Sequence, residues 1–143
     1  MPATYDIYPE HNLAIATLSG HLTVPEIVRN NMLYEADPCK SKGQATLINT
    51  AEVSDFRVSF GGLLAVAKYY LSLRDPFDPT ILTAIHAPSD LMFGKASLYQ
   101  RFVSNSEANC VGVFRTQPDC WRFLGIDPAD INPVPRTKGL LGQ

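Results

Sequence analysis

The chain lacks the features that mark several large functional classes. It has no cluster of lysines and arginines, because its 12 basic residues are scattered and balanced by 14 acidic ones, for a formal net charge of −2. Nucleic-acid binding depends on a basic patch, so we expect no nucleic-acid partner. Apolar runs such as residues 60–67 are far shorter than the roughly 20 residues that a bilayer requires, which predicts no integral membrane segment.

Metal and catalytic motifs are also missing. The cysteines, Cys39, Cys110 and Cys120, lack metal-type spacing, and the three histidines are isolated from one another. We therefore expect neither a metal nor another cofactor. The sequence contains no glycine loop of the kind that cradles phosphate and no Gly-x-Ser-x-Gly elbow. Free thiols, with an amino terminus that has neither a basic start nor an apolar stretch, indicate a cytoplasmic protein.

What is present is an ordinary globular composition. The chain has 143 residues, of which 45% are apolar and 18% charged, enough for one domain with a single core. We expect an α/β domain over residues 1–126. Residues 127–143 contain three prolines and no hydrophobic periodicity, which predicts an extended tail.

The most informative stretch is residues 81–125, which alternates between strand and helix patterns. Ser89 or Asp90 can cap the first of its helices, and Thr116 and Gly125 flank the second. The long connection between the two strands favours a parallel crossover. The predicted elements are, in order, a strand (81–86), a helix (91–103), a strand (111–114) and a helix ending at residue 124.

The amino-terminal half begins with two alternating segments, residues 4–8 and 13–18, which predict an antiparallel hairpin. Thr23 and Glu26 have the spacing of a capping box, so a helix begins there and reaches about residue 36. The next elements are a strand (45–49), a loop (50–58) and a strongly amphipathic helix (59–73). The predicted fold is an α/β domain with one mixed sheet of about five strands and about four helices.

Several short segments carry a family resemblance that spans about residues 5–125. They are Gly20-His21-Leu22-Thr23, Ala87-Pro88-Ser89-Asp90-Leu91, Phe93-Gly94, Tyr99-Gln100, Val113-Phe114-Arg115 and Trp121-Arg122-Phe123-Leu124. In this order and spacing the chain resembles the bacterial SpoIIAA-like family, which belongs with the anti-sigma-factor-antagonist (STAS) and Sec14-type lipid-binding folds. The resemblance implies a mixed sheet with helices packed on it and no established enzymatic activity.

The sequence departs from the family pattern at two places. Phospho-switched members of the superfamily carry an Asp-Ser-Ser-Gly-like turn before the second helix. In residues 53–63 of this chain, Ser59 falls near the phosphoacceptor position, but the Asp-Ser-Ser run is absent, which argues against phospho-switching. Ser59 and the nearby Asp55 are candidates for a regulatory site, because a phosphate would be stabilised at a helix N-terminus, although Ser59 can equally be a plain N-cap. The second departure is Lys95, where relatives tend to carry an apolar residue.

Lys95 has two interpretations. Its side chain either extends to solvent or meets an anionic group, such as a carboxylate or a lipid headgroup, above the strand ends where ligands of open α/β sheets gather. His86 ends its strand at the same edge, and Phe93 and Tyr99 add aromatic surface, so these four residues form the predicted ligand-binding set. A hydrolytic triad of His86 with the two regulatory candidates is disfavoured by the missing nucleophile elbow.

The first functional hypothesis is a non-catalytic binding or regulatory domain that acts through an unidentified protein partner and forms a homodimer. The helices at residues 59–73 and 90–103 would carry its working surface. The alternative is a carrier or sensor of a fatty acid or another small apolar ligand, held between those two helices with its acid group at Lys95. A small hydrolase is a third and weaker hypothesis.

Overall fold

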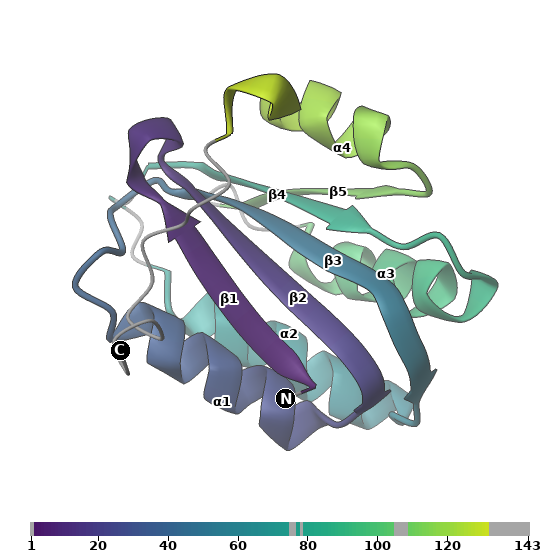
Figure 1. The fold of residues 1–143 in the computed structure, drawn as a ribbon. Coiled ribbons are helices and arrows are strands. Elements are labelled where there is room, and N and C mark those ends of the chain that lie inside the picture. Colours follow the sequence, from purple (N-terminus) through teal and green to yellow (C-terminus); the bar gives the residue numbers. More distant parts are fainter. Residues whose placement is uncertain (1, 75–76, 78, 105–108, 132–143) are drawn as a thin grey trace.

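The computed structural model describes residues 2–74, 77, 79–104 and 109–131 of the chain. Its centre is one five-stranded sheet whose strand order follows the sequence, from β1 to β5. The first two strands are antiparallel and all later neighbours are parallel, which confirms the predicted mixed sheet that opens with a hairpin (Figure 1). The strands are β1 (Ala3–Tyr8), β2 (Leu13–Leu22), β3 (Ala45–Phe56), β4 (Ile81–His86) and β5 (Asn109–Phe114).

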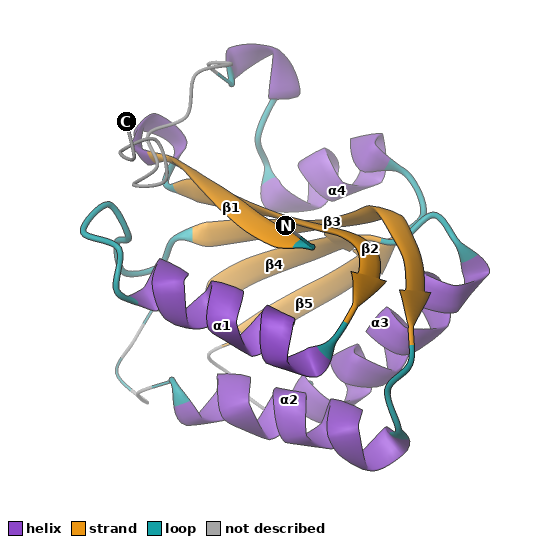
Figure 2. Ribbon diagram, turned by 60° about the horizontal axis from the view of Figure 1, so that its bottom comes forward, coloured by secondary structure: helices purple, strands orange, loops and turns teal. Residues whose placement is uncertain are grey.

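Helices cover the two faces of the sheet unequally (Figure 2). Three helices, α1 (Val24–Glu35), α2 (Phe60–Ser72) and α3 (Asp90–Val103), lie on one side, which we call the three-helix face. A single short helix, α4 (Gln117–Leu124), packs on the other side against β4 and β5, and we call that side the α4 face. The predicted α/β domain with five strands and four helices is confirmed.

Most helix ends were predicted from local signals. The capping box of Thr23 and Glu26 is present at the start of α1. Ser59 and Ser89 cap α2 and α3 by accepting hydrogen bonds from backbone N–H groups. Gly125 ends α4 with a left-handed φ of 71°, which favours a residue without a side chain. Thr116 was expected to cap α4 with its hydroxyl group, but the hydroxyl donates to the Asp119 carboxylate instead.

The predicted ends of β2 and β3 were wrong. The loop expected over residues 50–58 is mostly strand, and β2 continues beyond residue 18 to pair with it from Ser19 and Glu52 as far as Leu22 and Phe56. The register shifts twice along this extension, and Gly20 adopts a φ of 64° between the shifts. These bulges interrupt the simple alternation of apolar and polar residues, which is why the sequence pattern missed the extension.

Alternation along the strands divides the core in two. On the three-helix face, residues such as Ala16, Ile48 and Ile85 are aligned across neighbouring strands. The buried residues packed on this side include Leu18, Leu22, Val53, Phe56, Ile85, Met92 and Ala96. The α4 face has its own cluster of Leu13, Leu47, Ala84, Cys120 and Leu124. Successive residues of a strand therefore lie in two separate packing environments, one on each face of the sheet.

The described part of the predicted tail begins with a short 3-10 turn, Pro128–Asp130. The carbonyl oxygen of Asp130 lies 2.9 Å from Nε2 of His11, which is in the turn between β1 and β2. Ile131 packs against the α4-face cluster. The rest of the predicted tail, residues 132–143, lies outside the described residues. None of the described helices is long and apolar enough to cross a bilayer.

Candidate functional site

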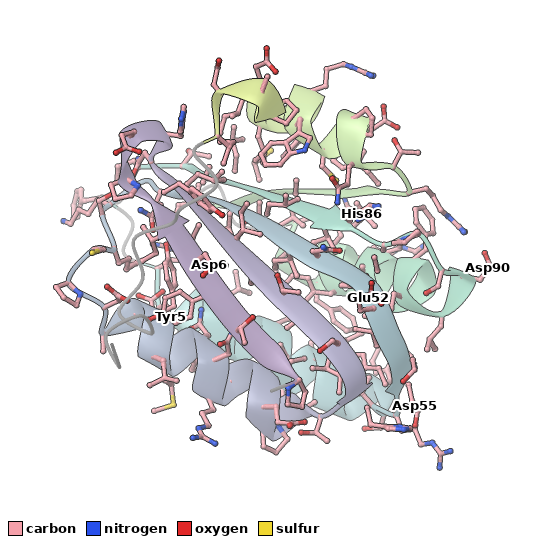
Figure 3. The ribbon with its side chains drawn as sticks, in the orientation of Figure 1. Tyr5, Asp6, Glu52, Asp55, His86 and Asp90 are labelled. Carbon is pink, nitrogen blue, oxygen red and sulfur yellow. The ribbon has the colours of Figure 1, made fainter. Side chains whose placement is uncertain are left out.

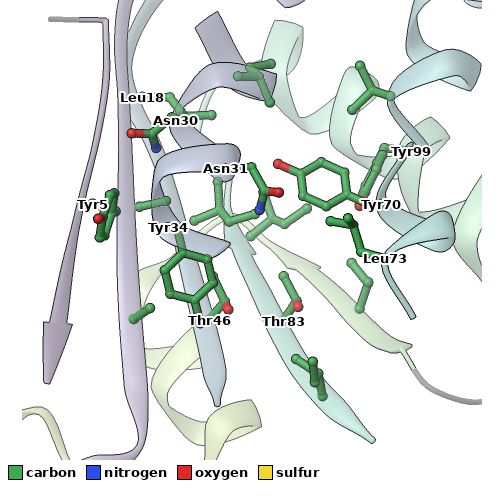
Figure 4. Close-up of a pocket in the computed structure, with 18 of the residues that line it drawn as sticks. Tyr5, Leu18, Asn30, Asn31, Tyr34, Thr46, Tyr70, Leu73, Thr83 and Tyr99 are labelled. Atoms are coloured by element: carbon green, nitrogen blue, oxygen red, sulfur yellow. The ribbon is translucent and has the colours of Figure 1, made fainter. Parts of the chain in front are cut away.

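A cavity of about 260 Å³ lies between the sheet and the three helices that cover it (Figure 4). Its floor contains a row of small side chains, because Ala14, Thr46 and Thr83 are direct neighbours on β2, β3 and β4. Larger aliphatic residues at these positions would fill the space under the helices. The cavity thus arises from the choice of side chains on the strands, in an otherwise regular sheet.

Apolar side chains dominate the middle of the cavity. The next row of the floor is formed by Ala16, Ile48 and Ile85, and the helices add Val66 and Met92 from above. All of these carry aliphatic or thioether groups with no hydrogen-bonding demand. This part of the cavity is suited to a hydrocarbon segment of a ligand.

Lys95 lies at the end of the cavity where the parallel strands end, which we call the carboxyl edge of the sheet. It is half-buried in the second turn of α3, and its Nζ donates to the carbonyl oxygen of Val58 at 3.4 Å. Within the described residues no carboxylate lies within ion-pair distance of this ammonium group. Lys95 therefore lines the cavity, and an anionic group that it would meet there stays a prediction.

The opposite end of the cavity, at the amino edge where β3 and β4 begin, is lined by polar groups. The Tyr34 hydroxyl donates to the Gln44 side-chain oxygen at 2.5 Å, and Asn31 accepts a hydrogen bond from Tyr69 at 2.9 Å. Tyr70 extends across the cavity toward Asn31 (Figure 4). Its ring packs edge-on against Tyr99, with 6.0 Å between the ring centres.

The tyrosine hydroxyl groups of this site remain protonated. Burial raises the pKa of Tyr34, Tyr70 and Tyr99 well above the ordinary value of 10.0. A protonated phenol can donate a hydrogen bond, so each hydroxyl that faces the cavity can act as a donor toward a bound oxygen. Two oppositely charged side chains lie nearby, Lys40 and Glu35, with 2.8 Å between the ammonium nitrogen and a carboxylate oxygen.

The structure divides the predicted ligand-binding set. Lys95 and Tyr99 line the cavity, whereas His86 and Phe93 do not. His86 lies on the α4 face, where Nδ1 is 3.3 Å from the Asn49 side-chain oxygen (Figure 3), and burial lowers its pKa. The ring of Phe93 is covered by the Arg115 guanidinium group, whose central carbon lies 4.2 Å from the ring centre. Both were assigned to the ligand site because strand ends and helix faces cannot be oriented from spacing alone.

The predicted regulatory residues lie apart from the cavity. The Asp55 carboxylate is 3.0 Å from the Arg57 side chain and 3.6 Å from His21, at the far end of β3 (Figure 3). Ser59 is exposed and accepts a hydrogen bond from the Gly62 N–H at 2.9 Å, which is the plain N-cap arrangement. In the described structure neither residue is hydrogen-bonded to His86, so the three groups do not form a catalytic triad there.

Sequence reasoning missed the polar end of the cavity. Tyr34, Tyr70, Thr46 and Thr83 were not predicted to contribute to a site, although all four line it. The sequence does contain one indication of this polar end, because Thr46 on β3 and Thr83 on β4 each stand next to a buried apolar residue of the same strand. Such a position usually carries Val or Ile in a covered strand, so a hydroxyl there suggests a polar neighbour.

The fold is an α/β domain, and its apolar chamber has Lys95 at one end and polar and charged side chains at the other. No protein-family model matches the chain, and no curated protein or solved structure matches it. The resemblance to the SpoIIAA-like family therefore stays a prediction from the sequence. Among the described residues, no three His, Cys, Asp or Glu side chains gather in a way that could hold a metal ion.

Proposed function

We propose that the protein binds a small, largely apolar ligand with an acidic group, and acts as a carrier or sensor of that ligand without transforming it. The observation that carries the proposal is the cavity of about 260 Å³, which is bounded by the sheet and three helices and is apolar along its middle. Ligand sites are typically concave and mostly apolar, with a few placed polar groups that fix orientation.

Lys95 is the group that we assign to the acid. A half-buried ammonium group whose only hydrogen-bond acceptor in the described residues is a carbonyl oxygen at 3.4 Å has donor capacity left over. A carboxylate beside it would form a charge-assisted hydrogen bond in a site that is partly shielded from water, where such bonds are strongest. Lys40, Lys42 and Arg74 also line the cavity, at its opposite end, and Lys40 is already paired with Glu35.

Native mass spectrometry and calorimetric titration with octanoate test the proposal. We expect a ligand mass that denaturation releases, or octanoate binding by the emptied protein. Lys95→Glu should weaken octanoate binding by roughly 100-fold, because it replaces a charge-assisted bond with a like-charge contact. The matched control is Lys68→Glu, at an exposed position of α2 that does not line the cavity. If wild-type protein binds no octanoate and carries no ligand, or if both variants bind octanoate equally well, the assignment is wrong.

A second candidate function is protein–protein interaction by a cytoplasmic homodimer of SpoIIAA-like type. The observation that favours it is two exposed apolar side chains at the starts of α2 and α3, Phe60 with 63% and Leu91 with 41% of their surface accessible. Both helices begin at the carboxyl edge, and the exposed ring of Phe60 also packs edge-on against Phe102 in the last turn of α3, with 5.1 Å between the ring centres. Exposed apolar groups at one edge are typical of an interface.

Sedimentation equilibrium tests this second candidate. If the α2 and α3 edge forms the dimer contact, Phe60→Asp should raise the dimer dissociation constant by roughly 30-fold, as expected for a central apolar interface residue. Met32→Asp is the matched control, since Met32 is equally exposed at 60% but lies on α1. A monomeric wild-type protein, or equal effects of both substitutions, would rule out this surface.

A further inference from the structure

Two hydroxyl groups at the amino edge of the cavity have no partner in the described structure. The side chains of Tyr70 and Thr83 both line the cavity, and neither hydroxyl makes a hydrogen bond with another described residue. Tyr70 is held in place by its ring contacts with Tyr69 and Tyr99, at 5.3 and 6.0 Å between ring centres. Its hydroxyl is therefore presented to the cavity by a ring that packing fixes.

Unpaired hydroxyl groups in a buried site constrain what fills it. A hydroxyl that loses water and gains no partner carries a desolvation penalty, so buried polar groups are nearly always hydrogen-bonded. A plain hydrocarbon tail at the amino edge would displace water from Tyr70 and Thr83 and replace none of its hydrogen bonds. A tail that carries an oxygen atom would satisfy them.

The two polar ends of the cavity are far apart. Lys95 is in the second turn of α3, near the carboxyl edge where that helix begins. Tyr70 is in the last turn of α2, which returns the chain to the amino edge (Figures 1 and 4). On β3 the residues that line the cavity run from Thr46 to Phe56, and Thr46 and Thr50 alone are four residues apart. Four residues of a strand span about 13 Å. A single ligand that reaches both ends must therefore be elongated.

The volume of the cavity limits the size of this ligand. An engineered apolar protein cavity of about 150 Å³ holds one benzene molecule. By proportion, the 260 Å³ of this cavity accommodates roughly ten non-hydrogen atoms. Octanoate has this size, whereas the long-chain fatty acids of membranes are much larger.

We infer that the ligand is a medium-chain carboxylate of about ten non-hydrogen atoms that carries a hydroxyl or carbonyl oxygen at the end remote from its carboxylate. The carboxylate lies at Lys95, the hydrocarbon chain crosses the floor of Ala16, Ile48 and Ile85, and the remote oxygen meets Tyr70 and Thr83. The inference rests on the proposed function and adds the class and orientation of the ligand.

Calorimetric titration with a matched pair of ligands tests the inference. Octanoate and ω-hydroxyoctanoate differ only in the remote hydroxyl. We expect ω-hydroxyoctanoate to bind roughly five- to tenfold more tightly, which is the effect of one added hydrogen bond. Tyr70→Phe removes only the phenolic oxygen and should abolish this advantage, and octanoate should bind this variant at least as tightly as the wild-type protein, because no hydroxyl is then left without a partner. Tyr8→Phe is the matched control, because Tyr8 packs against the α4-face cluster and should keep the advantage.

The outcomes separate the inference from the function on which it rests. Equal affinity of the two ligands for the wild-type protein overturns the inference, and octanoate binding then still supports the proposed function. An equal loss of both affinities in Tyr70→Phe also overturns it, because the tyrosine would then shape the cavity without contacting the remote oxygen. If neither ligand binds, the cavity is filled by water only, and both proposals fail. Should Tyr70→Phe not fold, as judged by near-ultraviolet circular dichroism, Thr83→Val replaces it with the same expectation.

Discussion

The two faces of the sheet are packed in opposite ways. On the α4 face, one helix of eight residues covers a close-packed cluster in which Ala84 and Cys120 have no accessible surface. On the three-helix face, three longer helices cover a cavity of about 260 Å³. The face with more helical cover is the less completely filled one.

The difference comes from which face receives the small side chains. Alternate residues of the same strands point to opposite sides, so Thr46 and Leu47 are neighbours in the chain but belong to different environments. On the helices, large rings such as those of Tyr34 and Tyr70 line the cavity opposite this small-residue floor. A regular sheet can therefore carry a dense core on one side and a ligand chamber on the other.

The largest expected effect comes from adding volume to each face in turn. Ala84→Leu should lower the free energy of unfolding by about 2 kcal/mol, because the α4 face has no space for the added atoms. Ala16→Leu should change it by less than about 1 kcal/mol in either direction, because the new side chain enters the cavity, and it should abolish octanoate binding. Urea denaturation measures the first effect and titration calorimetry the second.

If Ala84→Leu and Ala16→Leu lowered the free energy of unfolding equally, the comparison of the two faces would be wrong, because the cavity would then be as tightly filled as the α4 face. Unchanged octanoate binding by Ala16→Leu would contradict the position of the ligand.

A smaller effect is expected from acid, and it concerns the α4 face. Burial lowers the pKa of His86 below its ordinary value of 6.5, partly opposed by a hydrogen bond to the backbone of Arg115. The unfolded chain thus binds a proton near pH 6.5 while the folded chain binds it only at lower pH. Stability contributed by neutral His86 is complete above pH 6.5 and is lost as the pH falls below that value.

Thermal unfolding between pH 7.5 and pH 5.5 measures this contribution. The melting temperature of the wild-type protein should fall by a few degrees more over this range than that of His86→Gln, which carries no titratable group at the position. Asp6, whose pKa burial raises, titrates in both proteins and cancels in the comparison. Parallel melting curves across the range would show that His86 is not held neutral by the fold.

Local signals predicted the elements more successfully than the site. The caps at Thr23, Ser59 and Gly125 depend on residues within a few positions, and each was found where expected. The extended pairing of β2 and β3 was missed because bulges disturb the alternation on which strand prediction depends. Lys95 was singled out because a charge within an apolar helix face is visible in the sequence, whereas Tyr70 resembles any core aromatic residue until its neighbours are known.

The sequence by itself determined the order of strands and helices, the hairpin at the start, the helix caps and the oddity of Lys95, because each of these depends on contacts between residues close in the chain. Only the tertiary structure decided that His86 turns toward α4 while Lys95 and Tyr99 share a cavity. It also decided that Ala14, Thr46 and Thr83, from three separate strands, form one floor. Which side of the sheet a strand residue faces, and how much volume is left beneath the three helices, depend on contacts between residues that are far apart in the sequence. No local sequence pattern therefore predicts them.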